Sequence, residues 1–437
     1  MRLRLAMDVA TSSAVSAGED AASGVDSKDA YTVGWICALP LEMAAAKLML
    51  DEIHEFRVEQ DDGDHNAYIL GQMKGHKVVI ACLPKGVYGT VTAATVAKDM
   101  LRTFKSIRFG LMVGIGGGVP SSAHDIRLGD VVVSIPTDVD GGVIQYDRGK
   151  TGKEGEFIRI GSLNAPPTLL LTAAGKVETN HSLGESDMPQ LLAEAVEKIQ
   201  KPKIRQKYVY QEESNDCLFR PEYEHVDPDI GCNECDAAQT VQREKRDDTD
   251  PVAHYGNIAS GNQVIKHAET RDRLSRELGV LCFEMEAAGL MQEFPCLVIR
   301  GICDYSDSHK NKRWQEYAAA TAAAYGKELL SVVTPQRVEK EKPILYDPQI
   351  HNLLLETREA ILRHTKRQET HYENNKNREC INGLFQTDPV NDMKRILLDK
   401  GGLLEGSCQW ILDLPEYQRW NTIPHGSRLW IKGDPGK

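Results

Sequence analysis

The stretch CLVIRGICDYSD, residues 296–307, decides the fold because it joins a buried-strand pattern to an acidic loop. The run from Cys296 to Ile302 is short and mostly apolar, which predicts a strand inside a sheet. Asp304 follows this run directly. Ligands bind beyond the carboxyl ends of strands in open α/β sheets, so Asp304 is a candidate site residue. The structural alternative is a turn or cap aspartate, a role that Asp307 can take and so leave Asp304 free.

Outward from this strand, apolar runs alternate with helical patterns. The alternation predicts an α/β domain with a largely parallel or mixed sheet. The other predicted strands span residues 31–38, 77–82, 109–113 and 131–134, and the predicted helices span 41–52, 90–104 and 314–333.

Composition narrows the class of protein. The 437 residues are 41% hydrophobic, enough for two or three domains with a sizeable core. The formal net charge of −12 argues against a nucleic-acid-binding surface. The sequence holds no run of 18 apolar residues, which argues against a membrane span. Ten scattered cysteines favour reduced thiols and a cytoplasmic location.

Four segments depart from the alternation of the main domain, which we place at residues 29–335. Residues 1–28 lack a continuous apolar core, which predicts a disordered tail and not a signal peptide. Residues 210–251 are polar and aperiodic, which predicts an insertion loop. Residues 336–399 are charged and helical in pattern, which predicts a linker, and residues 400–437 become compact again.

A second acidic motif, FEMEAAG at residues 283–289, carries Glu286. With helical spacing, Glu286 shares an apolar face with Phe283 and Phe294. An unpaired carboxylate on such a face is costly, so it needs donors. Either the hydroxyls of a ligand supply them or Arg300 pairs with it, and the spacing alone leaves both alternatives open.

The glycine cluster GIGGG at residues 114–118 follows a predicted strand. Its backbone N–H groups can approach an anion or a sugar closely, and tight packing is the plainer explanation. A dinucleotide-binding fingerprint is excluded because no helical pattern follows the cluster.

The predicted insertion carries a candidate metal set. Cys232 and Cys235 have the Cys-x-x-Cys spacing of zinc ligands, and Cys217 with His225 completes a tetrahedral set. Unligated thiols in a reducing compartment are the alternative. A zinc ion bound here would be structural, since the motif implies no catalytic role.

Residues 31–333 resemble the purine nucleoside phosphorylase/nucleosidase superfamily, and most of all its methylthioadenosine/S-adenosylhomocysteine nucleosidase branch. The resemblance implies a single domain with a twisted mixed sheet flanked by helices, assembled as a homo-oligomer. Matching pieces occur in the family's order: CALPLE (37–42), the glycine cluster with LGDVVVS (128–134), IASGNQVI (258–265), EME (284–286) and RGICDYSD (300–307).

The resemblance also assigns roles to individual residues. Asp304 would act as the general acid at N7 of a purine. Glu286 would hold the ribose 2′- and 3′-hydroxyls, Met285 would pack on the sugar, and Glu42 would orient the attacking water. The reaction would require no cofactor. The other substrate-binding candidates are Glu284, Arg300, Val264, Ile265, Gly116, Gly117 and Gly118.

The sequence departs from the family at two of these places. Cys303 stands where the family commonly has Ser, and Val264 replaces an aromatic residue of the base-binding segment. Recognition of the 5′ end is open. The cations that could bind a 5′-phosphate there, or be solvated loop residues, are Lys85, Arg148, Lys150 and Lys153.

The C-terminal segment RLWIKGDPGK, residues 428–437, resembles the start of a NACHT-type domain of fungal NOD-like receptors. It contains only the first half of a P-loop, whose closing Gly, Lys and Ser/Thr are missing. We therefore expect no ATP binding by Lys437. The whole architecture resembles a fungal innate-immunity receptor with an enzyme domain as effector.

Together these features predict a purine nucleosidase that hydrolyses a nucleoside or nucleotide such as adenosine, AMP or ATP. Phosphorolysis is the first alternative, and Glu42 favours water. The second alternative is a catalytically silent module that senses nucleosides or mediates oligomerisation.

Overall fold

The computed structural model describes residues 27–345, apart from 56, 138 and 226–231, and a few single positions after residue 390. Contacts divide the chain into two units, Met1–Tyr346 and Asp347–Lys437. The predicted N-terminal tail lies almost wholly outside the described residues. So do most of the predicted linker and the segment that resembles a NACHT-type domain.

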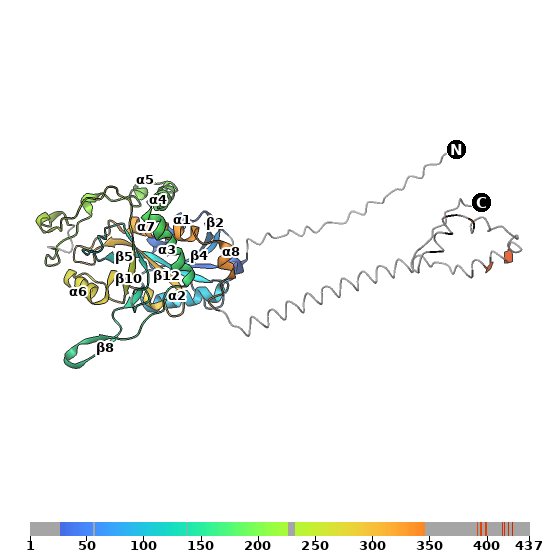
Figure 1. Cartoon of the computed structure of the whole chain (residues 1–437), viewed down its shortest axis with the longest axis horizontal. Helices are drawn as coiled ribbons and strands as arrows, with labels where there is room; N and C mark the ends of the chain where they lie inside the picture. The colour runs from blue at the N-terminus through green and yellow to red at the C-terminus, as the bar shows by residue number, and fades with distance from the viewer. Residues whose placement is uncertain are drawn as a thin grey trace. The chain divides into compact units, whose positions relative to one another are not determined.

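A large mixed sheet forms the centre of the first unit, and a separate hairpin pairs β8 with β9 (Figure 1). The strands are β1 (Val33–Cys37), β2 (Glu52–His54), β3 (Tyr68–Met73), β4 (His76–Cys82), β5 (Phe109–Gly118), β6 (Val131–Ser134), β7 (Val143–Gln145), β8 (Gly149–Thr151), β9 (Phe157–Arg159), β10 (Ala253–Ser260), β11 (Val280–Glu284) and β12 (Cys296–Asp304). The order across the sheet is β11-β10-β6-β12-β5-β1-β4-β3-β2, with β7 beside β10.

Parallel pairs hold the middle of the sheet, where β4, β1, β5 and β12 are neighbours. Antiparallel pairs join β2, β3 and β4 at one edge and β12 to β6. The end of β5 also pairs with β11 in antiparallel fashion. Because β11 already pairs with β10, this half of the sheet closes on itself. The α/β class predicted from the alternation is confirmed.

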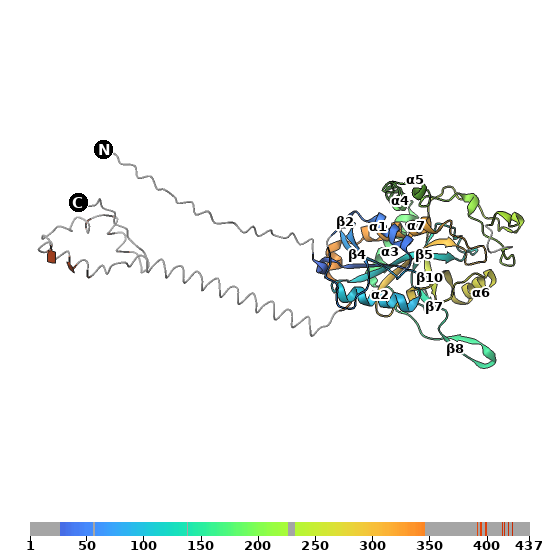
Figure 2. The same cartoon turned by 180° about the vertical axis from the view of Figure 1, so that it is seen from behind.

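Helices cover both faces of the sheet, with α1 and α7 on one side and α2 on the other (Figures 1 and 2). The alanine-rich α7 lies against β5, β12 and α1 and is buried nearly all round, as expected for a helix without a polar face. The helices are α1 (Pro40–Met49), α2 (Thr90–Thr103), α3 (Thr168–Ser182), α4 (Met188–Glu197), α5 (Pro202–Arg205), α6 (Ala268–Leu278), α7 (Gln315–Ser331) and α8 (Pro335–Lys340).

The central strand β12 is buried at every position, as its apolar sequence predicts. The strand predicted from Cys296 to Ile302 is confirmed, and it continues to Asp304. Among the described residues, none of the helices combines the length and apolar character that crossing a bilayer requires.

The helix expected around Glu286 is wrong. Glu286 lies between β11 and the short 3-10 turn η6 (Ala287–Gly289). The apolar residues before it pair with β10 and β5, so Phe283 faces its neighbours from a strand. A strand followed by a turn therefore produced the spacing expected of a helix. Short apolar runs do not distinguish a helix from a strand.

In its described part, the segment predicted as an insertion holds the isolated β-bridge between Phe219 and Thr240 and three single 3-10 turns. They are η3 (Glu213–Asn215), η4 (Cys232–Glu234) and η5 (Ala237–Gln239). Its end is held against the sheet, because both terminal guanidinium nitrogens of Arg246 donate to the Asp130 carboxylate at 2.7 Å.

Candidate active site

A cavity of about 540 Å³ lies where β1, β5, β11 and β12 end. This is the edge of an α/β sheet at which ligands commonly bind. The predicted site residues on its wall are Glu42, Gly116, Gly117, Val264, Ile265, Glu284, Met285 and Glu286. The wall also includes Cys303, Ser306 and Lys310, which surround Asp304. Four strands far apart in sequence thus meet at one cavity.

Glu42 is held rigidly in the first turn of α1. Its Oε2 accepts the backbone N–H groups of Ala38 and Leu39 at 2.7 and 2.9 Å, and its Oε1 accepts that of Ile115 at 2.8 Å. Burial raises the pKa of Glu42 and outweighs the opposing effects of Arg300 and the backbone donors. Oε1 keeps acceptor capacity for a further donor from the cavity.

Gly114 explains how Glu42 and Arg300 come so close to the strand. A Cβ atom on Gly114 would lie 2.5 Å from Oε1 of Glu42 and 2.5 Å from the NH1 nitrogen of Arg300. Any larger residue would therefore separate these two side chains from the backbone of β5.

Arg300 is fully buried behind the cavity wall and pairs with Glu284. Glu284 also accepts the backbone N–H groups of Glu286 at 3.1 Å and Ala287 at 3.0 Å. Its oxygens are therefore occupied within the protein. The partner that the sequence suggested for Glu286 thus belongs mainly to Glu284, which compensates an otherwise costly buried guanidinium.

Glu286 is the carboxylate with acceptor capacity left for a ligand. Its Oε2 lies 3.6 Å from the nearest Arg300 nitrogen and accepts the Met285 N–H at 3.3 Å. Burial, and then the negative charge of Glu284, raises the pKa of Glu286 to about 8, although Arg300 acts in the opposite direction. A carboxyl group in this state gains from ligand donors such as hydroxyls.

Asp304 closes β12 and is buried, and it lines a neighbouring cavity of about 290 Å³ that shares Cys303 and Lys312 with the first. Its Oδ1 accepts the Ser306 N–H at 3.0 Å, and its Oδ2 accepts the Cys303 thiol at 3.1 Å. Asp307 takes the separate cap role foreseen from the sequence, accepting the His309 N–H at 3.0 Å. Asp304 therefore caps only its own turn, and the next turn is capped by Asp307.

Lys310 is a functional candidate that the sequence did not reveal. Its Nζ lies 2.9 Å from Oδ2 of Asp304, and it is on the cavity wall. Burial lowers the pKa of Lys310, but the Asp304 carboxylate outweighs burial and raises it. In the sequence it resembles any loop lysine, and no signal distinguishes it from its neighbours.

The base-binding candidates are anchored at their start. Asn262 donates its N–H to Asp147 at 2.7 Å, and the carbonyl of Gln263 accepts the Tyr146 hydroxyl at 2.6 Å. Val264 and Ile265 follow on the cavity wall. Tyr88, which sequence reasoning missed, adds a half-exposed aromatic ring to the same wall.

The remaining predicted residues are placed elsewhere. Gly118 lies in β5, paired with Cys282 of β11 and off the cavity wall. The wall likewise excludes all four cations suggested for a 5′-phosphate, and β8 projects away from the sheet (Figure 1). Of the four candidate metal ligands, His225, Cys232 and Cys235 come together, and Cys217 is not part of that group.

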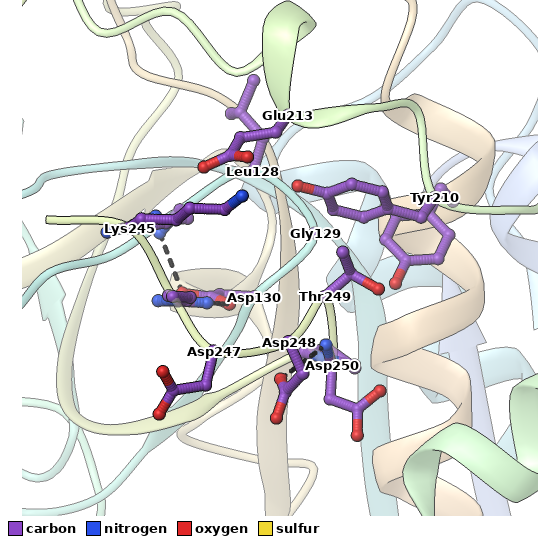
Figure 3. A pocket seen from close by; sticks show the side chains of 14 residues that line it. Leu128, Gly129, Asp130, Tyr210, Glu213, Lys245, Asp247, Asp248, Thr249 and Asp250 are labelled. Atoms are coloured by element: carbon purple, nitrogen blue, oxygen red, sulfur yellow. Dashed lines mark hydrogen bonds and ion pairs between the residues drawn. The ribbon is translucent and has the colours of Figure 1, made fainter. Parts of the chain in front are cut away.

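A second cavity, of about 220 Å³, surrounds Asp130 (Figure 3). None of the predicted site residues lines it. Asp130 is saturated there by Arg246 and by His254 at 2.9 Å. Burial raises the pKa of Asp130, yet these two partners outweigh it and lower the pKa. This cavity therefore marks where the insertion is fastened to the sheet.

Comparisons with known proteins agree with this arrangement. The chain is 50% identical over 312 residues to a nucleotide-binding leucine-rich repeat (NLR)-like protein of Hyaloscypha variabilis, covering 71% of this chain and 30% of that protein. It is 47% identical over 58 residues to the vegetative incompatibility protein HET-E-1 of Podospora anserina, covering 13% of this chain and 4% of that protein. The chain thus spans less than a third of the length of either relative.

A third relative is matched over nearly its whole length. The chain is 25% identical over 313 residues to a 5′-methylthioadenosine/S-adenosylhomocysteine nucleosidase of Mycobacterium bovis, covering 70% of this chain and 97% of that protein. The family model described as Phosphorylase superfamily matches residues 32–335, which contain the sheet and every residue of the cavity wall. The chain therefore belongs to the phosphorylase superfamily.

Proposed function

We propose that this domain hydrolyses the N-glycosidic bond of a purine nucleotide and releases the free base. The observation that carries the proposal is the convergence of Glu42, Glu286 and Lys310 on one cavity, with Asp304 paired to Lys310 behind its wall. Superfamily membership and the similarity to a nucleosidase support the same reaction class.

The Asp304–Lys310 pair would act on the leaving group. The bond between C1′ and N9 breaks, and its electron pair moves to the purine. A proton moves from the Lys310 ammonium, 2.9 Å away, through the Asp304 carboxylate to N7, which leaves Lys310 neutral. Protonation makes the base a better leaving group, which is the work of a general acid.

Glu286 and Glu42 would act on the sugar and on water. Glu286 accepts hydrogen bonds from the ribose 2′- and 3′-hydroxyls, and Met285 packs on the sugar. Glu42 orients a water molecule through the acceptor capacity left on Oε1 and takes its proton as the water attacks C1′. The raised pKa of Glu42 suits a base, and the flanking carboxylates suit an oxocarbenium-like transition state.

Two cations on the same wall favour a phosphorylated substrate. Lys266 and Lys312 are exposed and line the cavity, and neither forms an ion pair with the described residues. Lys310 and Arg300 are already neutralised by carboxylates. The two remaining ammonium groups match the 5′-phosphates of AMP or ATP, and they replace the loop cations suggested by the sequence.

Loss of adenine nucleotides would suit an effector domain. Because the first relative is NLR-like and extends well beyond this chain, we propose that the domain serves as the enzymatic output of a larger immune receptor. Expression in fungal cells should arrest growth and deplete ATP, and Asp304→Asn should abolish both effects. Growth arrest that persists unchanged in the variant would contradict this role.

The reaction itself is tested by assaying free base from adenosine, inosine, methylthioadenosine, AMP and ATP, with and without phosphate. Release without phosphate supports hydrolysis, and release only with phosphate would identify a phosphorylase. No release from any substrate would point to a silent module. Equal turnover of adenosine and ATP would contradict recognition of the 5′-phosphates.

A further inference from the structure

We propose that the insertion contains a structural zinc site formed by His225, Cys232 and Cys235. Their ligand atoms all lie within 4.8 Å of one another. The edge of a zinc–thiolate tetrahedron is about 3.8 Å, given Zn–S bonds of about 2.3 Å. Small side-chain rotations therefore suffice to close the three groups around one ion. Nitrogen and sulfur donors in this number are the set that zinc prefers.

We assign the fourth position to Cys217. It lines the same cavity as Cys232 and His309. Its thiol donates to the Ser214 carbonyl at 3.4 Å, a weak hydrogen bond that rotation toward the group would give up. Four protein ligands would close the site to water and substrate, which is the pattern of structural zinc.

A second observation at the same place is His309. Its ring is buried, and neither ring nitrogen has a hydrogen-bond partner among the described residues. The ring stacks on Phe219 with centroids 3.9 Å apart, and its centroid lies 5.2 Å from that of His225. A buried imidazole without partners indicates that a polar component is missing here, and a bound metal with its ligands would supply one.

The zinc site would hold the loop that carries Lys310. The N–H of His225 donates to the Ser308 hydroxyl at 2.9 Å, and the Cys232 sulfur lies 3.6 Å from the His309 carbonyl. Both contacts fall on residues next to Lys310. Fixing the two ligands would therefore fix the approach of Lys310 to Asp304, so these ligands are positioning residues.

The insertion is fastened to the same loop at other points. Asp216 accepts the Tyr305 hydroxyl and pairs with Arg243 at 3.0 Å. The indole N–H of Trp314 donates to the Asn215 carbonyl at 3.1 Å. The zinc site would thus complete a clamp whose other contacts are already formed.

Metal content of the full chain tests the site directly. Elemental analysis after purification with zinc and without chelator should give about one zinc per chain. Cobalt substitution should give absorption bands typical of thiolate-bound tetrahedral Co²⁺. The double variant Cys232→Ser, Cys235→Ser should lose at least nine-tenths of the metal, while the control Cys82→Ser should keep it. Absence of metal and of the cobalt spectrum in the wild type, or equal metal in the double variant, would overturn the site.

The fourth ligand and the positioning role have their own readouts. Cys217→Ser should weaken zinc affinity at least tenfold and alter the cobalt spectrum, whereas His309→Ala should leave the sulfur-to-cobalt bands in place. The reverse result would overturn the assignment of Cys217. The effect on turnover rests on the proposed function: zinc removal should lower kcat more than it raises KM. Zinc bound without base release refutes only the function, and an unchanged kcat after zinc removal refutes only the positioning role.

Discussion

The ammonium nitrogen of Lys310 lies 2.9 Å from Oδ2 of Asp304, although the two residues belong to a loop and to the end of a central strand. The proposed acid is therefore a buried carboxylate paired with a partly exposed lysine, and not a single carboxylate. This relationship changes what a substitution at either residue should do, because loss of one partner leaves the other without its ion pair.

Replacing Lys310 by Gln should slow base release about 10- to 100-fold, since the proton source beside Asp304 is lost. The effect should appear mainly in kcat. Lys207→Gln is the control, because Lys207 forms only a surface pair with Glu316. Steady-state assays of both variants check the prediction, and normal kcat in Lys310→Gln would contradict the proton-relay role.

The pH dependence should report Glu286. Its pKa is raised to about 8, so the free enzyme carries the ionised carboxylate only above that pH. If the carboxylate form holds the ribose hydroxyls, kcat/KM should rise with pH up to about 8 and level off above it. Glu286→Gln should lower kcat/KM and remove this limb. A profile that is flat between pH 6 and 9 in the wild type would count against the assignment.

Substitutions at the two neighbouring glutamates, Glu284 and Glu286, should differ in their effect on the free energy of unfolding. Glu284→Gln leaves Arg300 buried without its partner and should cost about 3–5 kcal/mol in the free energy of unfolding. Glu286→Gln should cost little at pH 5 and stabilise at pH 9. The folded state holds a proton on Glu286 more tightly than the unfolded state, so its contribution to stability falls as pH rises toward 8.

Denaturant unfolding of both variants at the two pH values measures this difference. Equal losses for Glu284→Gln and Glu286→Gln would show that the two carboxylates share the pairing with Arg300.

Gly117→Ala should impair activity with a smaller effect on binding. A Cβ at this position would lie 2.0 Å from Oγ of Ser306 and 2.7 Å from Oδ1 of Asp304. The acidic loop must therefore shift, and displacement of about 1 Å can cost 100-fold in rate. Gly175→Ala in α3 is the matched control, because a Cβ there meets nothing within 4 Å. Unchanged kcat in Gly117→Ala would mean that the loop adapts freely.

The double variant Lys266→Ala, Lys312→Ala should discriminate between substrates. Loss of two exposed cations should raise KM for ATP about tenfold, and added salt should shrink the difference. KM for adenosine should stay unchanged. Lys150→Ala, on the projecting hairpin, controls for general loss of charge. An equal rise in KM for adenosine would indicate a structural defect in place of phosphate recognition.

Much of the fold follows from local patterns. The buried strand from Cys296 and the helices beginning near Pro40, Thr90 and Gln315 were predictable because burial of one face imposes a period on the sequence. Asp304 was predictable as a site residue because it stands just after such a strand. The sequence identified Glu286 as a carboxylate whose burial without a partner would be costly. The helix predicted around it was wrong, because a strand followed by a turn can show the same spacing of apolar residues.

The partners of these residues were not predictable. The sequence suggested that Arg300 pairs with Glu286, yet in the folded protein Arg300 pairs mainly with Glu284. The sequence also suggested four loop cations for the substrate, and none of them lines the cavity. Cys217, His225, Cys232 and Cys235 were grouped by spacing, but only the fold brings three of them within ligand distance.

The sequence by itself determined the α/β class, the family and the acidic residues that border the cavity, because periodicity and ordered motifs are local properties of the chain. Only the tertiary structure decided that Lys310 meets Asp304, that Arg300 serves Glu284 and that Glu286 keeps acceptor capacity for a ligand. Such pairings depend on how loops and strands pack across the sheet, and the distances involved are set by atoms far apart in sequence.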